Sequence, residues 1–135
     1  MSADDQLDIL RVIALYCHVA DDRDGDRLGE VFAEDAVLQP TLTGPFTGLA
    51  AIRDYYLKFV PSQPIPTIGH YTLDSVIDLD PDGTTARVRS KGLGFRQDLG
   101  FCLSEYRDVF TKTAAGWRIA RRQIIRRTRF STDPA

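Results

Sequence analysis

Residues 68–128 read IGHYTLDSVIDLDPDGTTARVRSKGLGFRQDLGFCLSEYRDVFTKTAAGWRIARRQIIRRT. Four runs in this stretch, 68–79, 85–95, 101–111 and 117–128, have the composition of β-strands. The breaks between them are rich in turn residues: Asp80-Pro81-Asp82-Gly83, Asp98-Leu99-Gly100 and Ala114-Ala115-Gly116. Because these breaks are short, consecutive strands are expected to pair as hairpins. The stretch therefore predicts a four-stranded antiparallel meander.

The first half of the chain has a helical pattern instead. Apolar residues return at helical spacing from Ala3 to Ala20, and Ser2 is placed to cap that helix. A short second helix is expected over 27–32, followed by a strand over 36–40 and a turn into residues 46–47. A third helix is expected over 49–59, where Pro61 ends it. The predicted chain thus begins with three helices.

Helices first and strands later are typical of α+β proteins. The order predicts one domain over residues 1–135, cone-shaped, with three N-terminal helices packed on a strongly curved antiparallel sheet. A sheet that curls around a helix leaves an open mouth, and such concavities bind small molecules. We therefore expect one apolar pocket for a small organic ligand.

Charge and composition exclude several classes of function. The 17 basic and 19 acidic residues leave a net charge of −2, so nucleic acid is not an expected partner, and the arginines from Arg118 to Arg129 are expected to form a solvated, ion-paired face. No apolar run reaches membrane-spanning length and the first residues are acidic, which favours a cytoplasmic protein. Cys17 and Cys102 match no metal spacing, so free thiols and no metal site are expected.

Three local strings, taken with the element order, resemble the NTF2-like superfamily and its SnoaL-like branch. They are Tyr16-Cys17-His18-Val19-Ala20-Asp21-Asp22-Arg23-Asp24, Phe32-Ala33-Glu34-Asp35-Ala36 and Gly116-Trp117-Arg118-Ile119. Members of that superfamily act as dehydratases, isomerases, cyclases or epoxide hydrolases, and some only bind ligands. The resemblance therefore implies the fold without fixing the activity.

Within the superfamily, Tyr16, Asp21 and His70 match the pattern of the scytalone and bile-acid dehydratases. The resemblance implies a cofactor-free lyase or isomerase, with Asp21 and His70 as the acid/base pair and Tyr16 as the carbonyl donor. Dehydration of a β-hydroxy carbonyl compound needs these groups: a base, an acid and a donor that steadies the enolate. The substrate is expected to be small and hydrophobic.

The same residues also have structural interpretations. Asp21 is a suitable helix cap, Tyr16 a core residue and His70 a strand-end residue. The second histidine of scytalone dehydratase has no counterpart in residues 90–95, and Gln39 stands before Pro40 where ketosteroid isomerases have an aspartate. A ligand-binding protein without turnover and an epoxide-hydrolase-like enzyme remain alternatives.

Residues from several elements are expected to line the pocket. Strand alternation places Tyr106 and Asp108 on the face of Cys102 and Phe110, and it turns either Arg121 or Arg122 inward. The predicted substrate contacts are Gln39, Phe46, Tyr55, Phe59, Tyr106, Asp108, Trp117 and Arg121. Apolar residues on both faces of residues 85–95 also suggest that the sheet forms a homodimer.

Overall fold

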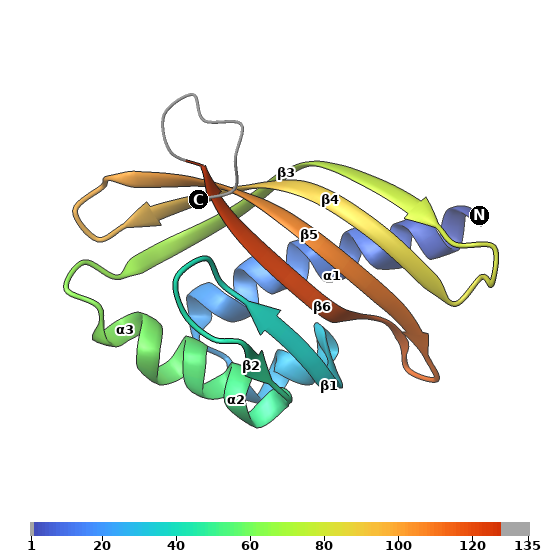
Figure 1. The fold of residues 1–135 in the computed structure, drawn as a ribbon, viewed down its shortest axis with the longest axis horizontal. Helices are drawn as coiled ribbons and strands as arrows, with labels where there is room; N and C mark the ends of the chain where they lie inside the picture. Colours follow the sequence, from blue (N-terminus) through green and yellow to red (C-terminus); the bar gives the residue numbers. More distant parts are fainter. Residues whose placement is uncertain (1, 128–135) are drawn as a thin grey trace.

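The structure is a computed structural model that describes residues 2–127. Its helical elements are α1 (Ala3–Asp22), the 3-10 helix η1 (Gly25–Glu30), α2 (Leu49–Asp54), the π-helical turn η2 (Tyr55–Phe59) and α3 (Val60–Ser62). Its strands are β1 (Phe32–Gln39), β2 (Phe46–Thr47), β3 (Thr67–Leu79), β4 (Thr85–Arg96), β5 (Phe101–Thr113) and β6 (Gly116–Arg127). Figure 1 shows that the helices lie along one side of a single sheet.

The sheet has six strands in the order β2-β1-β6-β5-β4-β3. The predicted meander is confirmed, because β3, β4, β5 and β6 pair in sequence as antiparallel neighbours. Thr128, the last residue of the fourth expected strand, lies outside the described residues.

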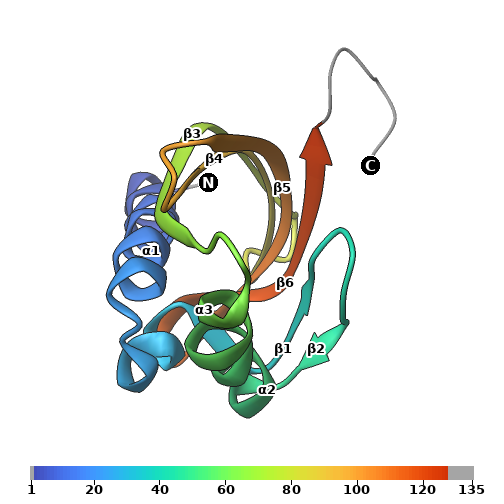
Figure 2. The same cartoon turned by 90° about the vertical axis from the view of Figure 1, so that its left-hand side faces the viewer.

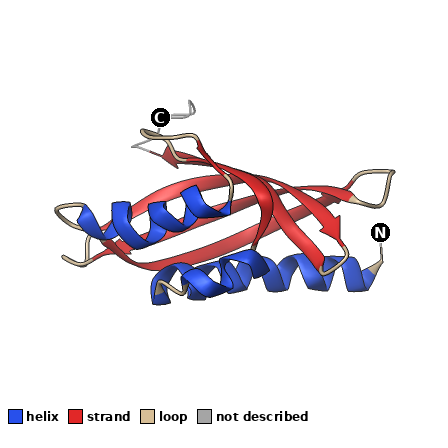
Figure 3. Ribbon diagram, turned by 90° about the horizontal axis from the view of Figure 1, so that it is seen from below, coloured by secondary structure: helices blue, strands red, loops and turns tan. Residues whose placement is uncertain are grey.

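The expectation of a strongly curved, wholly antiparallel sheet is wrong. The sheet is mixed because β1 lies parallel to β6, and it twists across its width without curling strongly into a cone (Figures 1 and 3). The concave side is completed by helices and loops instead of by the strands alone (Figure 2).

Helix α1 begins where its sequence predicts. The Ser2 hydroxyl accepts a hydrogen bond from the Asp5 backbone N–H, and Arg23 ends the helix in the left-handed conformation with φ 52°. The buried face of α1 packs against β3 and β6. Its side chains, among them Ile9, Val12 and Tyr16, join the sheet residues in one core.

The other two expected helices differ in detail from the prediction. Residues 25–30 form a 3-10 helix, and Phe32 already belongs to β1. The expected third helix continues through Pro61 to Ser62 as the segments α2, η2 and α3, which we call the helical arm (residues 49–62). At its wider π turn the Val60 N–H donates to the Tyr55 carbonyl. In Figure 2 this arm faces the concave side of the sheet across from β5 and β6.

Candidate functional site

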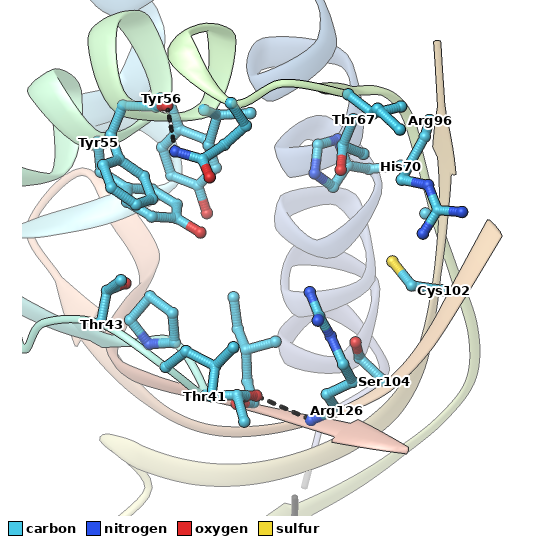
Figure 4. A pocket seen from close by; sticks show the side chains of 18 of the residues that line it. Thr41, Thr43, Tyr55, Tyr56, Thr67, His70, Arg96, Cys102, Ser104 and Arg126 are labelled. Carbon is cyan, nitrogen blue, oxygen red and sulfur yellow. Dashed lines mark hydrogen bonds between the residues drawn. The ribbon is translucent and has the colours of Figure 1, made fainter. Parts of the chain in front are cut away.

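A cavity of about 630 Å³ lies between the helical arm and the concave side of the sheet. Five aromatic side chains form much of its wall: Tyr16, Tyr55, Tyr56, Phe59 and Tyr106. The loop of residues 40–43 closes one side, and β3, β4, β5 and β6 supply the rest (Figure 4). Its size is within the usual range for small-molecule sites. Its wall combines these aromatic side chains with polar ones, so the lining is more polar than the expected apolar pocket.

The carboxylate of Asp21 holds His70 at the wall of this cavity. Oδ1 of Asp21 lies 2.5 Å from Nδ1 of His70, and Oδ2 accepts the His70 backbone N–H at 3.0 Å. Asp21 stands in the last turn of α1, whereas His70 lies on β3, which packs against that helix. Asp21 therefore fixes the imidazole in place instead of capping a helix.

This contact determines what the imidazole can do. A carboxylate that accepts from Nδ1 favours the tautomer with the proton on Nδ1, which leaves the Nε2 lone pair free. Nε2 makes no hydrogen bond within residues 2–127, and His70 lines the cavity (Figure 4). The Tyr16 ring meets the imidazole edge-on, with the ring centroids 5.9 Å apart. The arrangement leaves Nε2 of His70 available to whatever occupies the cavity.

A pair of tyrosine hydroxyls lies on the same wall. The Tyr16 and Tyr56 oxygens are 2.7 Å apart, and both side chains are buried. Burial raises the pKa of both hydroxyls well above the ordinary value, although the nearby Arg122 charge acts in the opposite direction. One hydroxyl donates to the other, so the protonated pair retains one O–H for a ligand.

Behind these tyrosines lies a fully buried ion pair. Arg122 donates from Nε and Nη2 to the two carboxylate oxygens of Asp108, each at 2.8 Å. Its guanidinium carbon stands 4.2 Å from the ring centroids of both Tyr16 and Tyr106. Burial opposes the charge, but Asp108 raises the pKa of Arg122 above its ordinary value. The pair thus supports the tyrosines of the site from within the sheet.

Several predicted residues occupy the expected places. Tyr16, His70, Tyr55, Phe59 and Tyr106 line the cavity, and Asp21 contacts it through His70. Tyr106 and Asp108 share the inward face of β5, and Arg122 rather than Arg121 is the arginine that turns inward on β6. His18, the other histidine, is exposed on α1.

Five predicted substrate contacts do not line the cavity, and their placement corrects the expectation. Gln39 lies on the β1 face opposite the buried Leu38, and its amide donates to the carbonyls of Pro40 and Thr43 at 3.0 Å each. It holds the loop that does line the cavity. Phe46 packs behind the wall, with its ring centroid 4.9 Å from that of Tyr55.

The other three corrections concern the sheet. Asp108 has no exposed side-chain surface because Arg122 occupies its carboxylate. Trp117 is buried beside α1, where its indole N–H donates to Asp5 at 2.9 Å. Arg121 is exposed because strand alternation turns it outward when Arg122 turns inward.

Sequence reasoning missed three contributions to the cavity. Thr41 and Thr43 come from the loop after β1, whose path no local signal predicts. Ser104 and Arg126 are inward on β5 and β6, and alternation from Tyr106 and Arg122 was sufficient to find them. Arg96, one residue beyond the expected strand 85–95, is the last residue of β4 and lines the cavity.

Three further findings concern possible metal ligands, membrane-spanning helices and the cysteines. Across residues 2–127, no group of three or more histidine, cysteine, aspartate or glutamate side chains is placed to bind a metal ion. None of the helices in that range combines the length and the apolarity that crossing a membrane requires. Cys17 and Cys102 are both half-buried free thiols.

Comparisons with known proteins agree with this architecture. An uncharacterized protein of Mycobacterium tuberculosis is 30% identical over 122 residues, covering 87% of this chain and 82% of its own length. A crystal structure of an NTF2-like protein with a cystatin-like fold from Novosphingobium aromaticivorans has a TM-score of 0.76 at 26% identity, with 90% of this chain and 80% of that chain covered.

Two other structures from Novosphingobium aromaticivorans show the same fold. A proposed aromatic ring hydroxylase has a TM-score of 0.79 at 25% identity, covering 97% of this chain and 94% of that chain. A proposed scytalone dehydratase has a TM-score of 0.75 at 22% identity, covering 99% and 95%. The SnoaL-like domain family matches residues 1–123. This match agrees with the helices packed on a mixed sheet and with the cavity between them. The chain therefore belongs to the SnoaL-like domain family and has its NTF2-like fold.

Proposed function

We propose that this protein is a cofactor-independent dehydratase acting by acid/base chemistry on a small hydrophobic carbonyl compound. The observation that supports the proposal most strongly is the Asp21–His70 contact at the wall of a cavity that also holds the Tyr16–Tyr56 pair. A base, an acid and a hydroxyl donor within one cavity are what elimination of water requires.

The imidazole of His70 acts first as the base and then as the acid. Nε2 of His70 takes the proton from the carbon beside the carbonyl, and the electrons of that C–H bond pass to the carbonyl oxygen as an enolate. When the enolate re-forms the carbonyl, the carbon–carbon double bond forms and the β-hydroxyl leaves. It takes the proton back from Nε2 and departs as water. Asp21 stabilises the imidazolium that exists between the two steps.

The tyrosine pair stabilises the enolate oxygen. Because burial raises the pKa of both hydroxyls, they remain protonated at neutral pH and donate to the developing negative charge. Phe59, Tyr55 and Tyr106 provide an apolar surface for the rest of the substrate. Such a surface limits the water that could protonate the enolate before the β-hydroxyl leaves.

The test is to incubate the protein with a panel of cyclic β-hydroxy ketones. Enone formation is followed by ultraviolet absorbance, and the loss of one water by mass spectrometry. For a substrate that turns over, His70→Ala is expected to lower kcat by about 100-fold or more, the usual size for a lost acid/base group. His18→Ala is the matched control because His18 is exposed on α1.

Turnover that His70→Ala leaves unchanged contradicts this mechanism. Asp21→Asn is expected to lower kcat as well, because the imidazolium loses its charged partner. Tyr16→Phe and Tyr56→Phe distinguish the roles of the two hydroxyls. Removing the hydroxyl that donates to the enolate is expected to lower kcat more than removing the hydroxyl that donates to its partner tyrosine.

The alternative is a ligand-binding protein without turnover. It is favoured by the presence of one histidine in the cavity where scytalone dehydratase uses two, and by glycines at positions 92 and 94. Ligand that co-purifies and is released chemically unchanged, together with no enone from any ketone in the panel, supports this alternative. Epoxide hydrolysis at the Asp108–Arg122 pair is disfavoured because neither side chain has exposed surface for water.

A further inference from the structure

The lining of the cavity has an unbalanced charge. Two arginines, Arg96 and Arg126, contribute to the wall together with His70, whereas no aspartate or glutamate of residues 2–127 does. Asp21 contacts His70 from the α1 side without lining the cavity. A cleft with one sign of charge and aromatic walls concentrates ligands of the opposite sign.

Arg126 is built into the wall by its backbone. The hydroxyl of Thr41 accepts the Arg126 backbone N–H at 2.9 Å and donates to the Ile124 carbonyl at 2.8 Å. This clamp fixes the end of β6 against the loop of residues 40–43. The side chain then extends into the cavity, beside its cross-strand neighbour Ser104 (Figure 4).

The guanidinium of Arg126 differs from those of its neighbours on β6. Arg122 is occupied by Asp108, and Arg127 turns to the outer face, 3.6 Å from Glu105. Within residues 2–127, Arg126 forms no ion pair. Arg96 lines the cavity from β4, two strands away, where its Nε atom lies 3.5 Å from Oδ1 of Asp98, an oxygen that also accepts the Gly100 N–H. Among the described residues, Arg126 is thus a cationic donor in the cavity that no carboxylate neutralises.

We propose that this end of the cavity binds an oxyanion carried by the ligand, with Arg126 and Ser104 as the donors and Arg96 adding to the positive field. The planar guanidinium donates two parallel hydrogen bonds to a carboxylate or to a phosphate. The apolar body of the ligand then lies against the tyrosines near His70. This inference rests on the proposed function only in taking the cavity as the ligand site, since charge selection needs no turnover.

The experiment compares 2-naphthoate with its uncharged counterpart 2-naphthamide by isothermal titration calorimetry at pH 8. We expect the wild-type protein to bind the naphthoate about fivefold to tenfold more tightly, a modest factor because Arg126 is exposed and partly hydrated. In Arg126→Gln the two ligands are expected to bind equally, and in Arg126→Lys part of the preference remains. Arg127→Gln is the matched control, because that arginine belongs to the outer face.

Naphthamide binding as tightly as naphthoate, or a preference that survives in Arg126→Gln, overturns the proposal, as does failure of every oxyanion probe to bind. A third titration, with 2-naphthyl phosphate, shows whether the site prefers a phosphate or a carboxylate, according to which of the two ligands binds more tightly. His70→Ala is expected to keep the preference. Loss of turnover can therefore be distinguished from loss of the preference for naphthoate. The binding test remains valid even if the protein does not catalyse the proposed reaction.

Discussion

The buried Arg122–Asp108 pair is the residue-level feature on which the tyrosine wall depends. Both side chains have no exposed surface, and the Nη1 atom of Arg122 has no hydrogen-bond partner within residues 2–127. The faces of Tyr16 and Tyr106 on either side of the guanidinium compensate for part of that desolvation. A charge in such a place is tolerated only while its partner is present.

Removing the carboxylate therefore destabilises the protein. Asp108→Ala leaves the Arg122 charge buried without its partner, and we expect the free energy of unfolding to fall by about 3 kcal/mol or more. Urea denaturation measures the change. Arg107→Gln breaks an outer-face ion pair with Glu105 and serves as control, with an expected loss of less than about 1 kcal/mol. A loss of similar size in both variants contradicts the argument.

How far the sequence predicts the site differs from residue to residue. Tyr16, Asp21 and His70 are predicted by resemblance, and the structure brings them together because α1 packs against β3. Gln39 illustrates the limit. It lies in the expected strand, but the direction of its side chain depends on which face of β1 meets the core. Such a direction is decided by long-range pairing, which local patterns do not encode.

At the level of elements, β4 is shaped by the residue that packs over it. A Cβ atom added at Gly92 would lie 2.6 Å from Cζ of Tyr106, on the neighbouring strand. Contact with Arg122 limits how far the buried Tyr106 ring can move. The absence of a side chain at position 92 is thus explained by the tyrosine that forms the cavity wall.

Gly92→Ala tests this packing. The added methyl group is expected to lower the free energy of unfolding by about 1–3 kcal/mol and to displace the Tyr106 ring. Thermal or urea denaturation gives the first quantity and a crystal structure of the variant the second. Gly29→Ala is the control, since its nearest contact is an ordinary 3.8 Å. Equal stability of Gly92→Ala and the wild type shows that the close approach is wrong.

The elements themselves were mostly predictable, for a local reason. Strands β3 to β6 follow from alternation and from the turn residues between them, and their observed bounds differ from the expected ones by a few residues at most. The parallel pairing of β1 with β6 joins residues far apart in sequence, which no turn signal reveals. The helical arm continues past Pro61 after a π turn. The pattern of apolar residues in the arm does not predict that turn.

At the level of the whole molecule, the outer face of β3, β4 and β5 carries a row of exposed apolar side chains. Tyr71, Leu73, Phe101 and Leu103 are 50–59% exposed there, next to Phe95. Contiguous apolar side chains of this kind indicate an interface. We propose that a second copy of the chain covers them, because the neighbouring Glu105 is already paired with Arg89 and Arg107, so its charge is neutralised where such a contact would form.

Size-exclusion chromatography with light scattering tests this proposal. The wild-type protein is expected to have the mass of two chains, and Leu73→Lys combined with Leu103→Lys the mass of one, because lysine adds charge repulsion to the apolar row. Leu7→Lys on α1, where the leucine is 64% exposed, is expected to leave the dimer intact. A wild-type protein with the mass of a single chain contradicts the proposal.

The central claim is that Asp21 holds His70 with its proton on Nδ1 and directs Nε2 into the cavity. Long-range proton–nitrogen NMR of the imidazole rings reads this tautomer directly, and the two histidines of the chain are assigned with His18→Ala. At pH 8 we expect the Nδ1–H tautomer for His70 in the wild-type protein and its loss in Asp21→Asn. An Nε2–H tautomer for His70, or a spectrum that Asp21→Asn leaves unchanged, contradicts it.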